Sequence, residues 1–264
     1  MSEAAPIRRP VALITGASAG IGAEFARVFA RHGHEMVLVA RREQRLRDLA
    51  DQIAAAGGQR PHLLTIDLGR QGASQQIAAE LAALGVKPQY LVNNAGFGLL
   101  GPAVELDHAE QLEMIDLNVR VLVELSLAFI DSLGRHRGGI LNVASVSSFL
   151  PGPGMAVYYA SKAFVLSFSE SLHEELRGTK IQVTNLCPGP TESNFSSVAR
   201  SHRAREAQAK KMSAAEVARI GHRDFRAGIH ISLPGAINKI SAFAPRVFPR
   251  AVVRRLIGRY NKLK

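Results

Sequence analysis

The chain contains a single cysteine, Cys187, among its 264 residues. One cysteine excludes an internal disulfide and favours a reducing compartment. The sequence also lacks an apolar run of about eighteen residues, the length that predicts a transmembrane helix. Residues 1–10 are polar and lack the apolar segment of a signal peptide. These absences predict a cytoplasmic protein.

Acidic residues are scarce in the last quarter of the chain. Residues 196–264 hold 16 Lys and Arg but 3 Asp and Glu, a balance of +13, and residues 1–195 carry −2, which gives the overall +11. The nine histidines form no metal-binding pattern, so no metal site is expected. A chain of this length with 47% hydrophobic residues suits one domain over 1–264, in which 196–264 form a basic substrate loop and a C-terminal helical extension.

A glycine-rich turn follows the first apolar run, Val11–Thr15, and leads into an amphipathic helix that reaches Arg31. A strand, turn and helix of this kind form a phosphate cradle, because backbone N–H groups and the positive helix end face the anion. Glycine allows the backbone to approach the ligand closely. The alternative is a tight turn without a ligand. The candidate cofactor-binding residues of the turn are Gly16, Ser18, Ala19, Gly20, Ile21 and Gly22.

The second predicted strand, residues 35–40, ends without an acidic residue. In dinucleotide-binding folds a carboxylate at this place binds the ribose hydroxyls of NAD. Here Ala40 is followed by Arg41 and Arg42, and a guanidinium can bind a phosphate with two hydrogen bonds. This favours NADP(H) over NAD(H). The alternative is that both arginines only begin a solvated helix.

Three polar side chains indicate proton transfer to a carbonyl or from an alcohol. Ser145 follows the apolar run 139–144, which predicts a buried strand, and so lies at a strand's carboxyl end, where open α/β sheets bind ligands. Tyr158 and Lys162 lie four residues apart on one face of a predicted helix. We expect the ammonium to lower the pKa of the phenol from about 10. The serine hydroxyl would hold the substrate oxygen.

These motifs and their order resemble the short-chain dehydrogenases/reductases. Residues 15–22 read Thr-Gly-Ala-Ser-x-Gly-Ile-Gly, residues 93–96 read Asn-Asn-Ala-Gly, and Tyr-x-x-x-Lys begins thirteen residues after the serine. The resemblance covers about residues 10–195. It implies that Tyr158 is the general acid/base and that Lys162 lowers its pKa and binds the nicotinamide ribose. It also implies that Ser145 orients the substrate oxygen.

The resemblance assigns further residues, each with a competing interpretation. It places Asp67, with Leu68 after it, at the adenine ring edge, whereas Asp67 could instead cap the helix after Gln71. Asn118 would hold a water in a proton relay, or it could be a satisfied core amide. A turn at residues 188–189 without a ligand is the alternative for the last group. The remaining cofactor contacts that the resemblance implies are Asn94, Ala95, Gly96, Tyr158, Lys162, Pro188, Gly189 and Thr191.

Strand and helix signals alternate through six units, which predicts an α/β fold with one doubly wound, Rossmann-type parallel sheet of about seven strands and helices on both faces. The expected function is an NADP(H)-dependent oxidoreductase that interconverts a carbonyl and a secondary alcohol. One alternative is an epimerase or dehydratase acting on a nucleotide sugar. Another is a non-catalytic NADP-binding regulator that uses a basic C-terminal helix to bind a partner.

The expected substrate is a small hydrophobic carbonyl or alcohol, because the segments expected to line its pocket are mostly apolar. These segments are residues 97–101, 149–155 and Phe195 onward. The resemblance also implies a homodimer or tetramer that buries the predicted helices near 109–133 and 157–177.

A basic amphipathic helix is predicted from Pro249 onward. Such a helix can lie on an anionic membrane, or it can dock its apolar face on its own body or on a second subunit. No aromatic interleaving or reading helix supports nucleic-acid binding. Its apolar half would carry Val252, Val253, Leu256, Ile257 and Tyr260, and its basic half Arg250, Arg254, Arg255 and Lys262.

Overall fold

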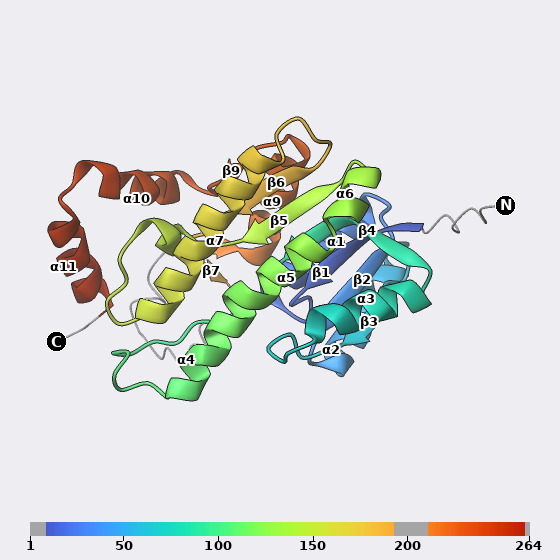
Figure 1. Cartoon of the computed structure of the whole chain (residues 1–264), viewed down its shortest axis with the longest axis horizontal. Helices are drawn as coiled ribbons and strands as arrows, with labels where there is room; N and C mark the ends of the chain where they lie inside the picture. The colour runs from blue at the N-terminus through green and yellow to red at the C-terminus, as the bar shows by residue number, and fades with distance from the viewer. Residues whose placement is uncertain (1–8, 193–210, 262–264) are drawn as a thin grey trace.

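The computed structural model describes residues 9–192 and 211–261. At its centre lies a seven-stranded sheet in the order β3-β2-β1-β4-β5-β6-β9, with every neighbouring pair parallel (Figure 1). The strands are β1 Arg9–Thr15, β2 Met36–Ala40, β3 His62–Thr65, β4 Val86–Asn93, β5 Gly139–Val143, β6 Gln182–Leu186 and β9 Ile231–Ser232. A separate pair joins β7 Thr191–Glu192 to β8 Met212–Ser213. The predicted fold class is confirmed.

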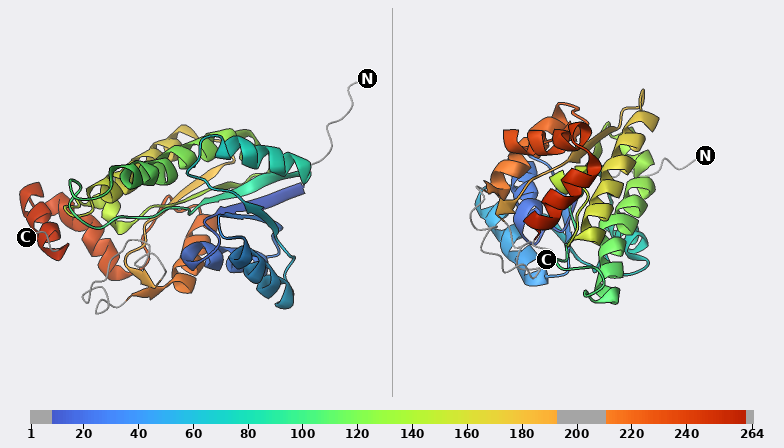
Figure 2. Two further views of the ribbon diagram at one scale, coloured as in Figure 1. Left: turned by 90° about the horizontal axis from the view of Figure 1, so that it is seen from below. Right: turned by 90° about the vertical axis from the view of Figure 1, so that its left-hand side faces the viewer.

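Helices cover both faces of the sheet (Figure 2). The apolar residues of α1, α2 and α9 pack with one face of the strands, and those of α3, α5, α6 and α7 pack with the other. Both sets meet strands that are buried on both sides, as a parallel sheet requires. The helices are α1 Gly20–Arg31, α2 Glu43–Ala55, α3 Ala73–Ala83, α4 His108–Ile115, α5 Val121–Ala128, α6 Ile130–Arg135, α7 Ala156–Glu175, α9 Ala214–Arg226, α10 Ala236–Val247 and α11 Arg250–Tyr260.

Two elements differ from the sequence-based prediction. The helix predicted near 109–133 is interrupted by a π-helical turn, η1 Asp116–Arg120, and broken again at Phe129, whose φ of −109° and ψ of 5° are not helical. The largely apolar residues 228–233 predict a seventh strand, but β9 is limited to Ile231–Ser232. The backbone leaves α9 through Gly228 at φ +71°, and only residues 231–232 are in register with β6.

Three asparagines stand side by side across the buried sheet. Asn93 of β4 is in register with Asn142 of β5, which is in register with Asn185 of β6. Asn93 Nδ2 donates to Asn142 Oδ1 at 2.9 Å, and Asn142 Nδ2 donates to Ser169 Oγ of α7 at 2.9 Å. The neighbouring strand and helix thus supply partners to Asn93 and Asn142, whereas the side chain of Asn185 has none among the described residues.

The C-terminal helices α10 and α11 project beyond the end of the sheet, far from the start of the chain (Figure 1). Their inner residues dock on the protein: Val253 is buried, and Asn261 Nδ2 donates to the carbonyl oxygen of Pro153 at 2.8 Å. Among the residues that the structure describes, no helix has both the length and the apolar character needed to cross a membrane.

Candidate active site

The glycine turn between β1 and α1 has the geometry of an anion cradle. Gly16 and Gly20 adopt φ of +65° and +57°, and a Cβ on Gly22 would lie 2.5 Å from the carbonyl oxygen of Gly16. The helix begins at Gly20 after Ala19, no side chain caps its first amides, and its first turn contains no acidic residue. Backbone N–H groups and the positive helix end therefore converge on one point, so the turn fits a diphosphate.

The exit of β4 is joined to this turn by Thr15, a residue that the sequence analysis did not single out. Thr15 Oγ1 donates to Val92 O at 3.2 Å and accepts from the backbone N–H groups of Asn94 and Ala95 at 3.0 and 3.1 Å. Asn94 Nδ2 returns a hydrogen bond to Thr15 O at 2.9 Å. The amide of Asn94 thus fixes two neighbouring loops to each other. The sequence signal that could have identified Thr15 is its hydroxyl at the end of a buried apolar strand.

Arg42 lies over the glycine turn. Its Nη2 donates to Ser18 Oγ at 2.9 Å, and its Nε donates to the same oxygen at 3.3 Å. Partial burial and the charges of Arg45 and Arg41 lower the pKa of Arg42. Arg41 itself is exposed, and Ala40, at the end of β2, offers no carboxylate. A concentration of positive charge beside a phosphate cradle fits an extra phosphate group.

Asp67 sits in a loop between β3 and α3, and its Oδ1 accepts from the backbone N–H of Gly69 at 3.1 Å. The helix that follows begins after Gly72 without a side-chain cap, so the alternative of Asp67 as its N-cap is wrong. Leu68 is buried in the core beneath the sheet, so its side chain packs on the protein and only its backbone is left for a cofactor.

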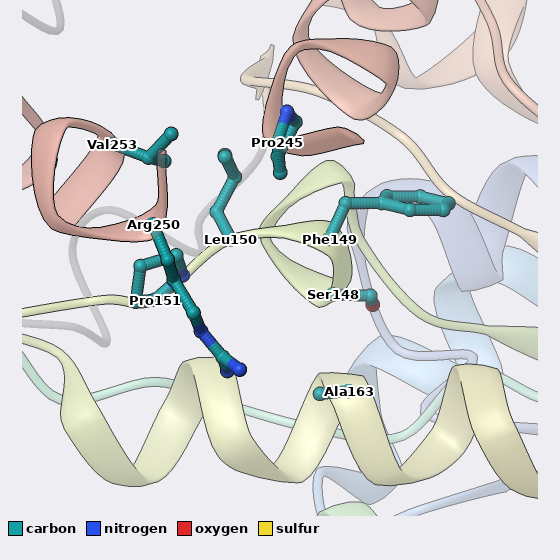
Figure 3. Close-up of a pocket in the computed structure, with 8 residues that line it drawn as sticks. All are labelled: Ser148, Phe149, Leu150, Pro151, Ala163, Pro245, Arg250 and Val253. Atoms are coloured by element: carbon teal, nitrogen blue, oxygen red, sulfur yellow. The ribbon is translucent and has the colours of Figure 1, made fainter. Parts of the chain in front are cut away.

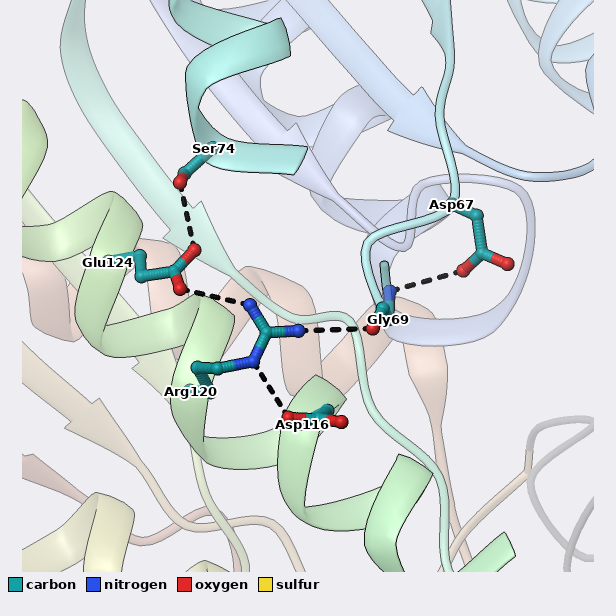
Figure 4. A network of polar contacts seen from close by, with 6 residues as sticks. All are labelled: Asp67, Gly69, Ser74, Asp116, Arg120 and Glu124. Atoms are coloured by element: carbon teal, nitrogen blue, oxygen red, sulfur yellow. Dashed lines mark hydrogen bonds and ion pairs between the residues drawn. The ribbon is translucent and has the colours of Figure 1, made fainter. Parts of the chain in front are cut away.

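Arg120 ties this loop to the α4–α5 helical segment (Figure 4). Its guanidinium pairs with Asp116 at 2.7 Å and Glu124 at 2.9 Å, and it donates to Gly69 O at 3.0 Å. Ser74 Oγ donates to the second oxygen of Glu124 at 2.8 Å. The adenine-side loop predicted from the sequence is therefore held by a charged network, which the sequence analysis missed. Asp116, Arg120 and Glu124 follow one another at four-residue spacing, but their contacts with Gly69 and Ser74 depend on the fold.

Ser145 and Tyr158 are brought together by the β5–α7 connection. Ser145 caps the short 3₁₀ helix η2 Val146–Phe149, and its Oγ accepts from the N–H of Ser147 at 3.1 Å. Tyr158, in the first turn of α7, is hydrogen-bonded with Ser145. Ser148 Oγ instead donates to Lys162 O at 2.8 Å. Tyr158 also interacts with the side chain of Ser147, so the choice of Ser145 by the thirteen-residue spacing stays a prediction.

Lys162 lies one turn further along α7 and is buried. Its Nζ donates to Val143 O, the last residue of β5, at 2.8 Å. A Cβ on Gly96 would lie 3.4 Å from this nitrogen, so the exit of β4 passes directly beside it. Burial lowers the pKa of Lys162 to about 8. The ammonium thus faces the ends of two strands rather than bulk water.

The protonation of Tyr158 differs from the sequence-based expectation. Burial raises the pKa of Tyr158 to about 12, and hydrogen bonding with Ser145 offsets only part of this effect. We expected Lys162 to lower the value. Its nitrogen is instead directed to the carbonyl oxygen of Val143, and burial reduces its own charge. Desolvation of the phenol therefore outweighs the nearby lysine in the protein alone.

Asn118 lies in the π-helical turn, and its side chain is saturated with protein partners. Oδ1 accepts from Phe97 N at 3.1 Å, and Nδ2 donates to Phe97 O at 2.9 Å and to Ser161 Oγ at 3.0 Å. The interpretation as a satisfied core amide is correct for this side chain. A role in a proton relay remains a prediction, and it would have to use the main chain.

The segment after β6 follows the same edge of the sheet. Thr191 Oγ1 donates to Gly189 O at 2.9 Å, and Val146 N donates to Pro188 O at 2.9 Å, so this segment lies beside η2. A Cβ on Gly189 would lie 2.2 Å from Asn238 Oδ1 of α10. The sequence analysis missed Asn238, because its contact with Gly189 joins two segments that are distant in the sequence.

A cavity of about 300 Å³ lies between η2 and the C-terminal helices (Figure 3). Tyr158 does not line it, so it is separate from the Ser145–Tyr158–Lys162 group. Phe149, Leu150 and Pro151, from the segment 149–155 that was expected to line a substrate pocket, border this cavity. Phe195, also expected there, lies outside the described residues. The lining consists of Ser148, Phe149, Leu150, Pro151, Ala163, Pro245, Arg250 and Val253.

These groups converge because β1, β4, β5 and β6 are neighbours in one parallel sheet. Their carboxyl ends carry the glycine turn, the 94–96 turn, Ser145 and the 187–191 segment in that order. The chain leaves β1 toward β2 on one side and returns at β4 on the other, which is the topological switch point where such sheets bind ligands. The predicted residues thus lie together at the carboxyl ends of the central strands.

Known proteins share this arrangement. A family model described as short chain dehydrogenase matches residues 10–204. Sulfoacetaldehyde reductase 2 of Chromohalobacter salexigens is 39% identical over 191 residues, which cover 71% of this chain and 75% of that protein.

Two solved structures match nearly the whole chain. The short-chain dehydrogenase of Sphingobium yanoikuyae in complex with NADPH is 30% identical with a TM-score of 0.79, and covers 97% of this chain and 96% of its own. The bulky-bulky ketone specific alcohol dehydrogenase of Comamonas testosteroni is 27% identical with a TM-score of 0.75 and the same coverage. With the family model matching most of its length, the chain belongs to the short-chain dehydrogenase family and is an oxidoreductase acting on a carbonyl/alcohol pair.

Proposed function

We propose that the chain uses NADP(H) to interconvert a ketone and a secondary alcohol, with Tyr158 as general acid/base. The observation that carries this proposal is the hydrogen bond of Tyr158 with Ser145, one helical turn from the buried Lys162, at the sheet edge that also holds the glycine turn. When bound, the cofactor supplies or accepts the hydride. The protein positions the substrate oxygen and moves the proton.

In the free protein, the protonated form of Tyr158 is the one that reduction requires. With a pKa near 12, Tyr158 keeps its proton at neutral pH and can donate it to a carbonyl oxygen. The Ser145 oxygen accepts from Ser147 N, and its O–H, which bonds with Tyr158 in the free protein, would turn to donate to the same substrate oxygen. For alcohol oxidation the phenol must lose its proton. Positive charge from Lys162 and from an oxidised nicotinamide ring would favour that loss.

Proton supply to Tyr158 would pass through Lys162 and the π-helical turn. In this turn the hydrogen bonds lengthen to i→i+5, as shown by Val121 N donating to Asp116 O. Because the amide of Asn118 is fully used, the main-chain carbonyl of Asn118 would hold the relay water. The side chain would keep the turn in place against Phe97 and Ser161.

The preference for NADP(H) rests on the charge over the glycine turn. Arg42 contacts Ser18 there, Arg41 is adjacent, and Ala40 leaves no carboxylate to repel a 2′-phosphate. The Sphingobium structure, which holds NADPH, supports the same assignment. Thr191 and the 188–189 backbone would hold the nicotinamide carboxamide, and Asp67 the adenine edge.

The substrate proposed is a hydrophobic ketone. The described segments near Tyr158, residues 97–101 and 149–155, are mostly apolar, and the matching alcohol dehydrogenase is named for bulky-bulky ketones. We also propose a homodimer that buries α4, α5 and α7. Four large apolar side chains on these helices are between 41% and 56% exposed: Leu112, Ile115, Leu127 and Phe164.

The test is Tyr158→Phe, with Tyr159→Phe as the matched control, because the Tyr159 ring packs on Gly152. We expect Tyr158→Phe to lower kcat on a responsive ketone by about 10²–10⁴-fold while the Kd for NADPH stays unchanged. Tyr159→Phe should keep its turnover. The substrate is first found by NADPH depletion over a ketone panel, with NADH as the disfavoured cofactor. Equal loss of NADPH binding and turnover would show that Tyr158 is structural, and retained turnover would contradict the mechanism.

A further inference from the structure

The C-terminal helices expose an unusual amount of apolar surface. Eight large apolar side chains between residues 237 and 260 are 43% to 74% exposed, more than in all the rest of the described chain. We call this set the C-terminal apolar face. Its members are Ile237, Ile240, Phe243, Val247, Phe248, Val252, Leu256 and Tyr260.

The exposed residues form a stripe on each helix. On α10, residues 237, 240, 243 and 247 fall within about 120° of arc, and on α11, residues 252, 256 and 260 fall within about 80°, at about 100° per residue. The opposite sides are docked, through the buried Ala242 on α10 and through Gly258 and Asn261 on and just after α11, and the buried Val253 borders the stripe of α11. Docking on the chain's own body therefore accounts for the inner sides alone and leaves the stripes uncovered.

The charges beside the stripes all have one sign. Residues 236–260 contain six basic residues and no Asp or Glu, and acidic residues are absent from 225 to the end of the sequence. None of the six forms an ion pair with another described residue. On the helical wheel, Arg255 and Arg259 lie within about 60° of one edge of the α11 stripe, and Lys239 and Arg246 lie within about 60° of one edge of the α10 stripe. The remaining two basic residues are Arg250 and Arg254.

These charges discriminate between the candidate partners. A two-fold contact between copies would bring the same basic patch against itself, with no acidic residue on either side to compensate. An anionic lipid surface supplies negative charge to the arginines and an apolar layer to the side chains between them. We propose that the C-terminal apolar face binds anionic lipid bilayers and holds the protein peripherally on the membrane.

The position of the face connects it with the site. Asn261, directly after α11, bonds to Pro153, in the segment between η2 and α7 that leads to Tyr158. Arg250 and Pro245 also line the cavity against η2 (Figure 3). Binding to a bilayer would thus place the segment before Tyr158 close to the lipid surface. The lipid binding itself needs no cofactor and no turnover, so its test is independent of the proposed reaction.

The test is co-sedimentation of the full chain with vesicles of phosphatidylcholine alone or mixed with phosphatidylserine. We expect binding to the mixed vesicles at least about 10-fold stronger than to the neutral ones, and weaker at high salt because salt screens the arginines. Phe243→Ser with Leu256→Ser, and separately Arg255→Glu with Arg259→Glu, should each reduce binding to the mixed vesicles about 10-fold or more. Val104→Ser, also at an exposed position but outside the face, is the matched control and should bind as the wild type does.

Three outcomes would overturn the proposal. The first is no binding of the wild type to phosphatidylserine vesicles. The second is a change of oligomeric state in the Phe243→Ser, Leu256→Ser variant, seen by light scattering, with vesicle binding intact, since the face would then join copies. The third is equally tight binding to soluble polyglutamate that is indifferent to the serine substitutions, which would identify an acidic macromolecule as the partner. Circular dichroism confirms that each variant is folded.

Discussion

At the scale of single residues, His222 links stability to pH. Its ring is 4% exposed, packs edge-on against Phe29 at 4.9 Å, and lies 4.4 Å from His32. Burial, followed by the charges of His32, Arg226 and His34, lowers the pKa of His222 from 6.5 to about 4. The unfolded chain therefore takes up the proton first. Stability from this residue is complete above about pH 6.5 and declines as the pH falls toward 4.

We expect His222 to remove about 1–2 kcal/mol of unfolding free energy between pH 7 and pH 5, a range that allows for solvent screening. Urea unfolding at the two pH values measures the loss, and His222→Leu is the comparison because it keeps an apolar packing group without a titrating one. The loss should be smaller in the variant by that amount. Equal losses in both proteins would assign the pH dependence to other groups.

Some residue assignments followed from the sequence and others did not. Ser145, Tyr158 and Lys162 were identified because chemistry and spacing agree locally: a serine after a strand, and two side chains four apart on a helix. The direction of the pKa shift of Tyr158 was not predicted, because desolvation depends on what packs over the ring. Arg120 and Thr15 were missed for a related reason. Their partners, such as Gly69 and Val92, are brought close by the fold alone.

At the scale of elements, the sequence predicts which segments are strands and which are helices, but not the residues at which they begin and end. Apolar runs and glycines determined β1, the turn at Gly16 and the left-handed cap at Gly33. The π-helical turn and the break at Phe129 were not predicted, because the apolar spacing of a helix continues through both. The length of β9 depends on register with β6, which is a tertiary property.

The asparagine row across β4, β5 and β6 allows a paired test of buried hydrogen bonding. Asn142 and Asn185 are both fully buried. Asn142 bonds to Asn93 and Ser169, whereas neither side-chain polar atom of Asn185 has a partner among the described residues. Asn142→Ala should cost about 2–4 kcal/mol, because it leaves polar partners unpaired and opens a small cavity. Asn185→Ala removes two unpaired atoms and should cost about 1 kcal/mol or less.

Urea denaturation of the two variants at neutral pH measures both values under matched conditions. The decisive quantity is the difference between them, because both substitutions delete the same atoms from neighbouring strands. A difference near zero would show that Asn185 contributes as many effective hydrogen bonds as Asn142. The hydrogen bonding of the asparagine row would then extend to β6 instead of ending at β5.

At the scale of the whole molecule, two exposed apolar surfaces require different partners. The surface of α4, α5 and α7 carries Leu127 and Phe164, 56% and 45% exposed, and apart from the buried Lys162 these helices carry six glutamates and no Lys or Arg. The two surfaces therefore carry opposite charge: an anionic bilayer would repel the acidic surface and attract the basic C-terminal apolar face, which leaves a second copy as the partner proposed for the acidic one. Self-association is therefore expected through α4, α5 and α7, and lipid binding through α10 and α11.

This division is tested by placing a charge on each surface. Leu127→Glu with Phe164→Glu should convert a dimer to a monomer, because each copy would bury two uncompensated carboxylates in the contact. Ile237→Glu, on α10, should leave the dimer intact. Light scattering of both variants at the same concentration measures the mass. A monomeric wild type would contradict self-association through α4, α5 and α7. Dissociation caused by Ile237→Glu and not by the α5–α7 pair would show that the basic face joins the copies instead.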